Sequence, residues 1–228
     1  MPNTLKNATL SNKRNRQRSV EPEVSNYLQF IDTLYDDLEF VIGNLNKYKD
    51  KYYQGMKDNS KQGENLVNTT ICNMLNCRGW KADHDVHING NADIVVTLPY
   101  TDYQWLGEGK INSNQTSYTD AYQGLKQLLY RYSTGLDNQN SGGVILYITE
   151  TQKNQLDILN NWKEVVEKKV DIADDDDMPY APALRLEVCP KSNLVFYSYH
   201  IHSSSGLEYT VRHMIIDFRH QPKDRRKK

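Results

Sequence analysis

The chain has 228 residues, of which 38% are hydrophobic and 25% are charged. This composition is typical of one globular domain with a buried core and excludes a fibrous protein. No run approaches 18 apolar residues and residues 1–18 lack an apolar segment, so we expect a cytoplasmic protein without a membrane span or signal peptide. The three cysteines, too few for a secreted disulfide scaffold, are expected to be free buried thiols.

The net charge of −1 conceals an uneven distribution of charged residues. Residues 1–18 carry five basic residues and no acid, and residues 223–228 carry five basic residues and one acid. The region 19–222 therefore has a net charge of −10, from 18 basic and 28 acidic residues. Basic, disordered ends suit contact with a polyanion such as nucleic acid, although solubilising tails have the same composition.

The segment 24–47 is expected to form an amphipathic helix after the acidic, proline-marked start Glu21-Pro22-Glu23. Its apolar residues recur at helical spacing: Tyr27, Phe30, Ile31, Leu34, Leu38, Val41, Ile42 and Leu45. We interpret residues 1–58 as a basic tail plus this helical arm. The arm either packs on the rest of the chain or mediates self-association or contact with a partner subunit.

After the polar stretch 47–63, a mixed order of helices and strands is expected. A helix over 62–78 ends at Gly79, and the Asn89-Gly90 pair between two alternating runs predicts a hairpin. The expected strands cover 80–88, 92–98, 103–111, 143–149, 183–189, 193–202 and 208–218, and further helices cover 119–133 and 152–170. This order predicts an α/β fold, in which residues 59–150 form a core of a mixed sheet covered by helices. Residues 151–228 then add a helix, the last strands and a basic tail.

Four candidate site residues lie on successive elements of that core: Glu64, Asp93, Glu108 and Lys110. Period-2 alternation along a strand places Glu108 and Lys110 on one face. The 15 positions between Asp93 and Glu108 allow one strand to end, turn and return alongside the next. One or two carboxylates plus a substrate phosphate are the usual ligands of Mg²⁺, and a neighbouring lysine can orient or deprotonate a water or offset phosphate charge.

These residues stand in segments that resemble a known enzyme core. GENLVNTTICNMLNCRGW, NADIVV, WLGEGKI, AYQGLKQLLYRY and GVILYI resemble, in order and spacing, the PD-(D/E)XK restriction-endonuclease-like nuclease superfamily over roughly residues 62–149. That core is a mixed sheet with the element order α-β-β-β-α-β. The resemblance implies a Mg²⁺ or Mn²⁺ site formed by Asp93, Glu108 and the supporting acid Glu64, with Lys110 as the catalytic lysine. It also implies a site glutamine on the following helix, Gln127, with Gln123 as the fallback.

Two positions depart from the pattern of that superfamily. Ala92 stands where the motif name has proline, and Gly109 stands between Glu108 and Lys110 where an apolar residue is usual. Neither departure removes a ligand, although glycine inside a strand costs some stability.

Simpler interpretations exist for each candidate residue. In the simplest interpretation, Lys110 and Glu108 form an exposed ion pair that stabilises the fold by about 0–1 kcal/mol. Glu64 is then an acid favoured by the helix dipole, and Gln127 an ordinary exposed helix residue. For Asp93, which stands among Ile94, Val95 and Val96, burial of a carboxylate without a partner would cost stability, so a site is the favoured interpretation.

The function we expect is metal-dependent hydrolysis of phosphodiester bonds, in DNA more than in RNA, with a role in restriction, phage defence or repair. The alternative is a catalytically silent nuclease-fold protein that binds nucleic acid or assembles with a partner. The acidic central region disfavours tight contact with a long duplex unless the basic ends or a partner subunit supply phosphate contacts.

Overall fold

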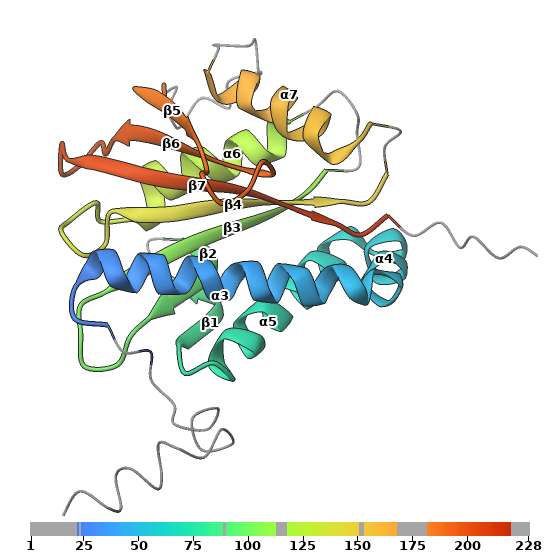
Figure 1. Cartoon of the computed structure of the whole chain (residues 1–228), viewed down its shortest axis with the longest axis horizontal. Coiled ribbons are helices and arrows are strands. Elements are labelled where there is room, and N and C mark those ends of the chain that lie inside the picture. The colour runs from blue at the N-terminus through green and yellow to red at the C-terminus, as the bar shows by residue number, and fades with distance from the viewer. Residues whose placement is uncertain are drawn as a thin grey trace, which may run out of the picture.

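A computed structural model of the chain describes residues 22, 24–88, 90–112, 118–150, 153–167 and 182–219. It has three layers, with a seven-stranded sheet between two layers of helices (Figure 1). No helix in these ranges is long and apolar enough to cross a membrane. The basic ends, Asn89 of the expected turn and the acidic run 174–177 lie outside the described residues.

The sheet is mixed, with antiparallel edges around a parallel centre. Its strands are β1 (Lys81–His87), β2 (Asn91–Thr97), β3 (Gln104–Asn112), β4 (Ser141–Ile148), β5 (Arg185–Val188), β6 (Val195–Ile201) and β7 (Glu208–Asp217). They lie in the order β1-β2-β3-β4-β7-β6-β5, in which β4 runs parallel to both β3 and β7. All eight residues of β4 are buried, as a central strand covered on both faces requires. All seven expected strands are therefore present, within a few residues of the expected ends.

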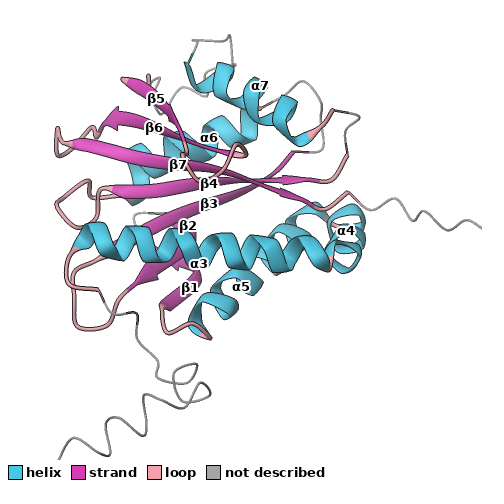
Figure 2. Ribbon diagram, viewed as in Figure 1, coloured by secondary structure: helices cyan, strands magenta, loops and turns pink. Residues whose placement is uncertain are grey.

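Three helices cover one face of the sheet: α3 (Tyr27–Lys47), α4 (Lys49–Asp58) and α5 (Ser60–Asn76). Figure 2 shows α3 lying along this face, with α5 beside it. The apolar stripe of α3 is buried in a core shared with α5 and the sheet, and Phe30, Leu34, Leu38 and Val41 have no exposed surface. The stripe that we considered for self-association therefore belongs to the core.

Polar contacts also fix α3 to the rest of the chain. The Asp37 carboxylate accepts a hydrogen bond from the Trp80 indole at 2.8 Å and pairs with Arg78. The buried Arg212 guanidinium of β7 donates to Glu39 at 2.6 Å and stacks on the Tyr35 ring. Because these contacts join α3 both to the segment between α5 and β1 and to β7, α3 is an integral layer of the domain.

The helix α4 was not expected. Its segment is polar, and Met56 is its one buried residue. Asn59 ends α4 in an extended conformation, and its side chain accepts a hydrogen bond from Gln62 N at the start of α5. This cap starts α5 at Ser60, two residues earlier than expected. The expectation that the three cysteines are buried was wrong for Cys77, which is exposed, whereas Cys72 and Cys189 are buried as expected.

The opposite face carries α6 (Thr119–Gln127), a π-helical turn (Leu128–Tyr132) and α7 (Gln155–Glu167). Their apolar side chains form a second core with β3, β4 and β7. The expected helix 119–133 is thus an α-helix that changes to a π-helix after Gln127. Short π-helical segments are often found at functional sites.

Candidate active site

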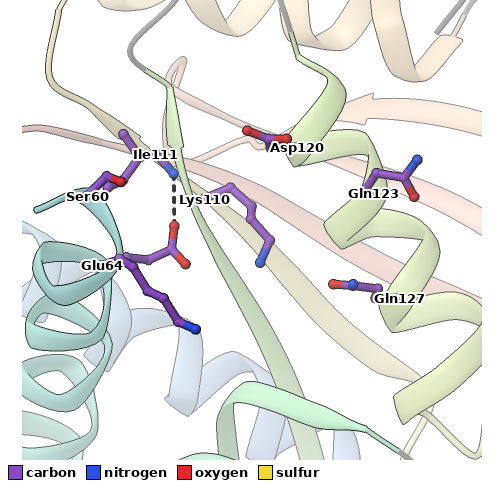
Figure 3. Close-up of a pocket in the computed structure, with 8 residues that line it drawn as sticks. Ser60, Glu64, Lys110, Ile111, Asp120, Gln123 and Gln127 are labelled. Atoms are coloured by element: carbon purple, nitrogen blue, oxygen red, sulfur yellow. Dashed lines mark hydrogen bonds between the residues drawn. The ribbon is translucent and has the colours of Figure 1, made fainter. Parts of the chain in front are cut away.

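The site is built where β2 and β3 separate. Their pairing ends at Ile94 and Gly107, although β3 continues to Asn112 and stays paired with β4 throughout. One edge of β3 is thereby left without a strand partner. Side-chain carboxylates accept hydrogen bonds from the N–H groups on this edge. Gly109 N donates to Asp93 Oδ2 at 3.0 Å. Ile111 N donates to Glu64 Oε2 at 3.3 Å (Figure 3).

Lys110 joins two of the expected acids. Its Nζ atom lies 2.8 Å from Glu108 Oε2 and 3.4 Å from Asp93 Oδ2. Glu108 and Lys110 point to the same side of β3, toward α6, as alternation along a strand requires. Gly124 of α6 gives Lys110 room, because a Cβ atom there would stand 3.1 Å from Lys110 Cε, closer than most such contacts, and would be in ordinary contact with Glu108 Cβ at 3.5 Å.

The Glu108 carboxyl group is held in an unfavourable environment for its charge. The residue is 1% exposed, and neither carboxyl oxygen accepts a hydrogen bond of normal geometry within the described ranges. Burial first, and then the Asp93 carboxylate, raises the pKa of Glu108 well above its usual range, while Lys110 opposes the shift. The interpretation as an exposed ion pair is therefore wrong.

Lys110 remains protonated in this environment. Burial acts to lower its pKa, but the Glu108 and Asp93 carboxylates outweigh burial and raise that pKa above the ordinary value. Its ammonium group is thus a hydrogen-bond donor and a fixed positive charge between two acids.

A pocket of about 460 Å³ opens beside Lys110, between the first turns of α5 and the outer side of α6. Figure 3 shows Gln127 pointing into it, toward Lys110, whereas Gln123 points away. Glu64 also borders the pocket, but Asp93 and Glu108 do not. Its lining residues are Ser60, Lys61, Glu64, Lys110, Ile111, Asp120, Gln123 and Gln127. Lys110 therefore connects the pocket to the two acids that it contacts.

Several residues near this pocket were not expected from the sequence. Ser60 and Lys61 line it because α5 begins earlier than its apolar pattern indicates, and Asp120 lines it from the first turn of α6. The buried Tyr132 ring packs against Gly90, where a Cβ atom would stand 2.5 Å from the ring. The ring lies close enough to Glu108, Lys110 and Asp93 to interact with their charges. Burial, with a further contribution from Glu108, raises the pKa of Tyr132 to about 12, so it is a neutral phenol.

Asp93 and Glu108 bring carboxylate oxygens, the donor type that Mg²⁺ prefers, next to Lys110. Within the described ranges, no three His, Cys, Asp or Glu side chains are grouped closely enough to hold a metal ion. The expected set of Asp93, Glu108 and Glu64 is therefore not gathered into one cluster, because Glu64 binds Ile111 N while Lys110 contacts the other two. Mg²⁺ usually takes one or two carboxylates plus waters, and the buried oxygens of Glu108 beside Asp93 are donors of that kind.

Comparison of the chain with protein families, with curated proteins and with solved structures gives no match. The candidate site consequently rests on the residues and geometry of this chain.

The Glu64 carboxyl group makes folding stability depend on pH. Burial, which Lys110 partly offsets, raises its pKa from 4.5 to about 6. The folded chain thus binds this proton more tightly than the unfolded chain, and the free energy of unfolding falls as pH rises from 4.5 to 6. In metal-free buffer, Glu64→Gln should remove at most about 2 kcal/mol of that fall, since the group is partly exposed. Urea unfolding of wild type and Glu64→Gln at pH 4 and pH 7 measures how far the free energy of unfolding falls in each protein. An equal fall in both would contradict the assignment of this pH dependence to Glu64.

Proposed function

We propose that the chain is a divalent-metal-dependent nuclease with a PD-(D/E)XK, restriction-endonuclease-like core that hydrolyses phosphodiester bonds, in DNA rather than RNA. One observation carries the proposal. A buried glutamate and a second acid meet one lysine where β2 and β3 separate, next to a pocket.

The energetics of Glu108 support a functional site. Glu108 Oε2 is paired with Lys110, but Oε1 is buried without a hydrogen-bond partner among the described residues, and this costs stability that an apolar residue in the same space would not lose. A strongly raised carboxyl pKa is typical of catalytic or ligand-binding groups, and Glu108 lies next to the pocket through its contact with Lys110, although it does not line the pocket itself. Structural ion pairs shift pKa values too, but they normally satisfy both carboxyl oxygens, whereas Oε1 of Glu108 has no hydrogen-bond partner in the described part of the chain.

The order of elements gives independent support. The helix α5, strands β1 to β3, helix α6 and strand β4 follow one another in the α-β-β-β-α-β order of the superfamily core. Asp93 and Glu108 lie on adjacent strands at the point of separation, and Gln127 faces the pocket from the helix after β3.

Asp93 and Glu108 are the residues that would hold the metal. When bound, the ion polarises the phosphate and lowers the pKa of a bound water. Lys110 then donates from its ammonium group to a phosphate oxygen or orients the water, and its raised pKa disfavours a role as general base. Glu64 fixes the end of β3 through Ile111 N, and Gln127 offers an amide to a substrate in the pocket.

Incubation of the purified chain with supercoiled plasmid, linear duplex, single-stranded DNA and RNA tests the proposal. We expect cleavage with Mg²⁺ or Mn²⁺ that EDTA abolishes, with the DNA substrates cut faster than RNA. The absence of cleavage on all four substrates with either ion would contradict the proposal.

The position of Lys110 favours a second candidate, a catalytically silent nuclease-fold protein that binds nucleic acid or a partner. In this candidate the ammonium group permanently replaces a cation beside Asp93 and Glu108. Calorimetric titration with Mn²⁺ separates the two candidates. Binding that Asp93→Asn weakens supports the nuclease, and DNA binding without Mn²⁺ binding supports the silent protein.

A further inference from the structure

The residue between Glu108 and Lys110 is glycine for a reason that lies on the opposite face of β3. A Cβ atom on Gly109 would stand 2.5 Å from Asn68 Oδ1 and would also overlap the Tyr147 hydroxyl. Real Cβ atoms do not approach other atoms so closely, so any larger residue would push β3 away from this pair. The two polar groups thus occupy the space that an apolar side chain would otherwise fill.

Asn68 and Tyr147 form a buried pair beneath the strand. Tyr147 of β4 donates a 2.5 Å hydrogen bond to Asn68 Oδ1 of α5, and both residues are fully buried. The Asn68 Nδ2 atom is buried and has no hydrogen-bond partner among the described residues. A buried donor without a partner costs stability, so core packing alone does not explain an asparagine at this position.

The pair belongs to a larger set of contacts between α5 and β3. Asn68 lies one helical turn after Glu64, so both side chains are on one side of the helix. Glu64 accepts from Ile111 N, and Asn68 packs beneath Gly109, two residues earlier on the strand. The helix therefore contacts the residues on either side of Lys110.

We propose that Asn68 and Tyr147 are positioning residues. They fix the distance of Gly109 from α5 and thereby keep Glu108 and Lys110 in contact with Asp93. The inference rests on the proposed function in its catalytic part. Gly109 supplies the link between the two faces, because its N–H donates to Asp93 Oδ2 at 3.0 Å while the pair fills the space where its Cβ atom would stand. Losing the Tyr147 hydroxyl would let the strand settle into the vacated space and lengthen that hydrogen bond.

The test uses Tyr147→Phe, with Tyr209→Phe as the matched control. Tyr209 also places a fully buried hydroxyl beneath a glycine, Gly142, but at the opposite end of β4. We expect Tyr147→Phe to speed hydrogen exchange at the Gly109 and Ile111 amides about 10-fold, measured by NMR, and the control to leave both unchanged. We also expect kcat for DNA cleavage to fall about 10-fold at constant KM, because small misplacements of reacting groups slow chemistry rather than binding.

A double variant separates positioning from general stability. Asn68→Leu combined with Tyr147→Phe replaces both polar groups by apolar groups of similar shape, which should restore the thermal midpoint lost in Tyr147→Phe. If the pair positions β3, kcat stays low in the double variant despite this recovery.

Two results would overturn the inference: a kcat that recovers together with stability, or amide exchange at Gly109 and Ile111 that equals the wild-type rate in Tyr147→Phe. If the wild-type chain cuts no nucleic acid, the proposed function fails, and the exchange rates still decide whether the pair holds β3.

Discussion

Lys110→Ala should reduce metal-dependent DNA cleavage by about 10²- to 10⁴-fold, the range for loss of a proton-transfer or charge-stabilising group. The side chain is the group that contacts both Glu108 and Asp93 and also borders the pocket. Its loss removes the positive charge from the place where the phosphate would be attacked. Single-turnover cleavage at saturating DNA measures the chemical step directly.

Asp93→Ala should produce a loss of similar size, because it removes a proposed metal ligand and the acceptor of Gly109 N. Gln123→Ala is the control, since Gln123 lines the same pocket but points away from Lys110. The assigned site would be contradicted if Lys110→Ala or Asp93→Ala cleaved DNA at the wild-type rate. It would also be contradicted if Gln123→Ala lost as much activity as those two variants. Circular dichroism of each variant shows whether it has folded.

The strands themselves and the adjacency of β1, β2 and β3 were predictable because they depend on local patterns, whereas the order of the remaining strands in the sheet was not predicted. Alternation along WLGEGKI places Glu108 and Lys110 on one face, and the Asn89-Gly90 pair marks the hairpin that brings β2 alongside β1. Once β3 is adjacent to β2, the 15-residue separation brings Asp93 next to Glu108. These steps require no knowledge of distant contacts.

Other features depend on tertiary contacts and left no pattern in the sequence. The helix α4 has one buried residue, so no apolar periodicity marks it. The Asn68–Tyr147 hydrogen bond joins residues 79 positions apart, and the overlap that requires Gly109 appears only when α5 and β4 are placed. The position of Lys110 between Glu108 and Asp93, rather than beside a three-acid cluster, likewise depends on how β2, β3 and α6 are placed.

The Glu108–Lys110 pair should cost the protein stability. The combined substitution Glu108→Leu and Lys110→Met replaces the pair by apolar side chains of similar volume. We expect the free energy of unfolding at pH 7 to rise by about 1–4 kcal/mol, the effect of such replacements for buried ion pairs. The gain comes from removing a fully buried carboxyl group that only Lys110 partly compensates, since its Oε1 atom has no hydrogen-bond partner within the described ranges. Cleavage should be lost in the same variant.

The pH dependence of that gain identifies its source. Burial raises the pKa of Glu108, so folded wild-type protein binds this proton more tightly than the unfolded chain, and its stability falls as pH rises above the ordinary value of 4.5. The double variant lacks the group, so its advantage should be small at pH 4 and grow toward pH 7. Urea unfolding in EDTA at both pH values measures it, with Lys110→Met alone as the control. That single variant should be less stable than wild type at pH 7, because it leaves Glu108 buried without a partner. A double variant less stable than wild type at pH 7 would mean that the ion pair stabilises the fold, and the energetic support for a functional site would be lost.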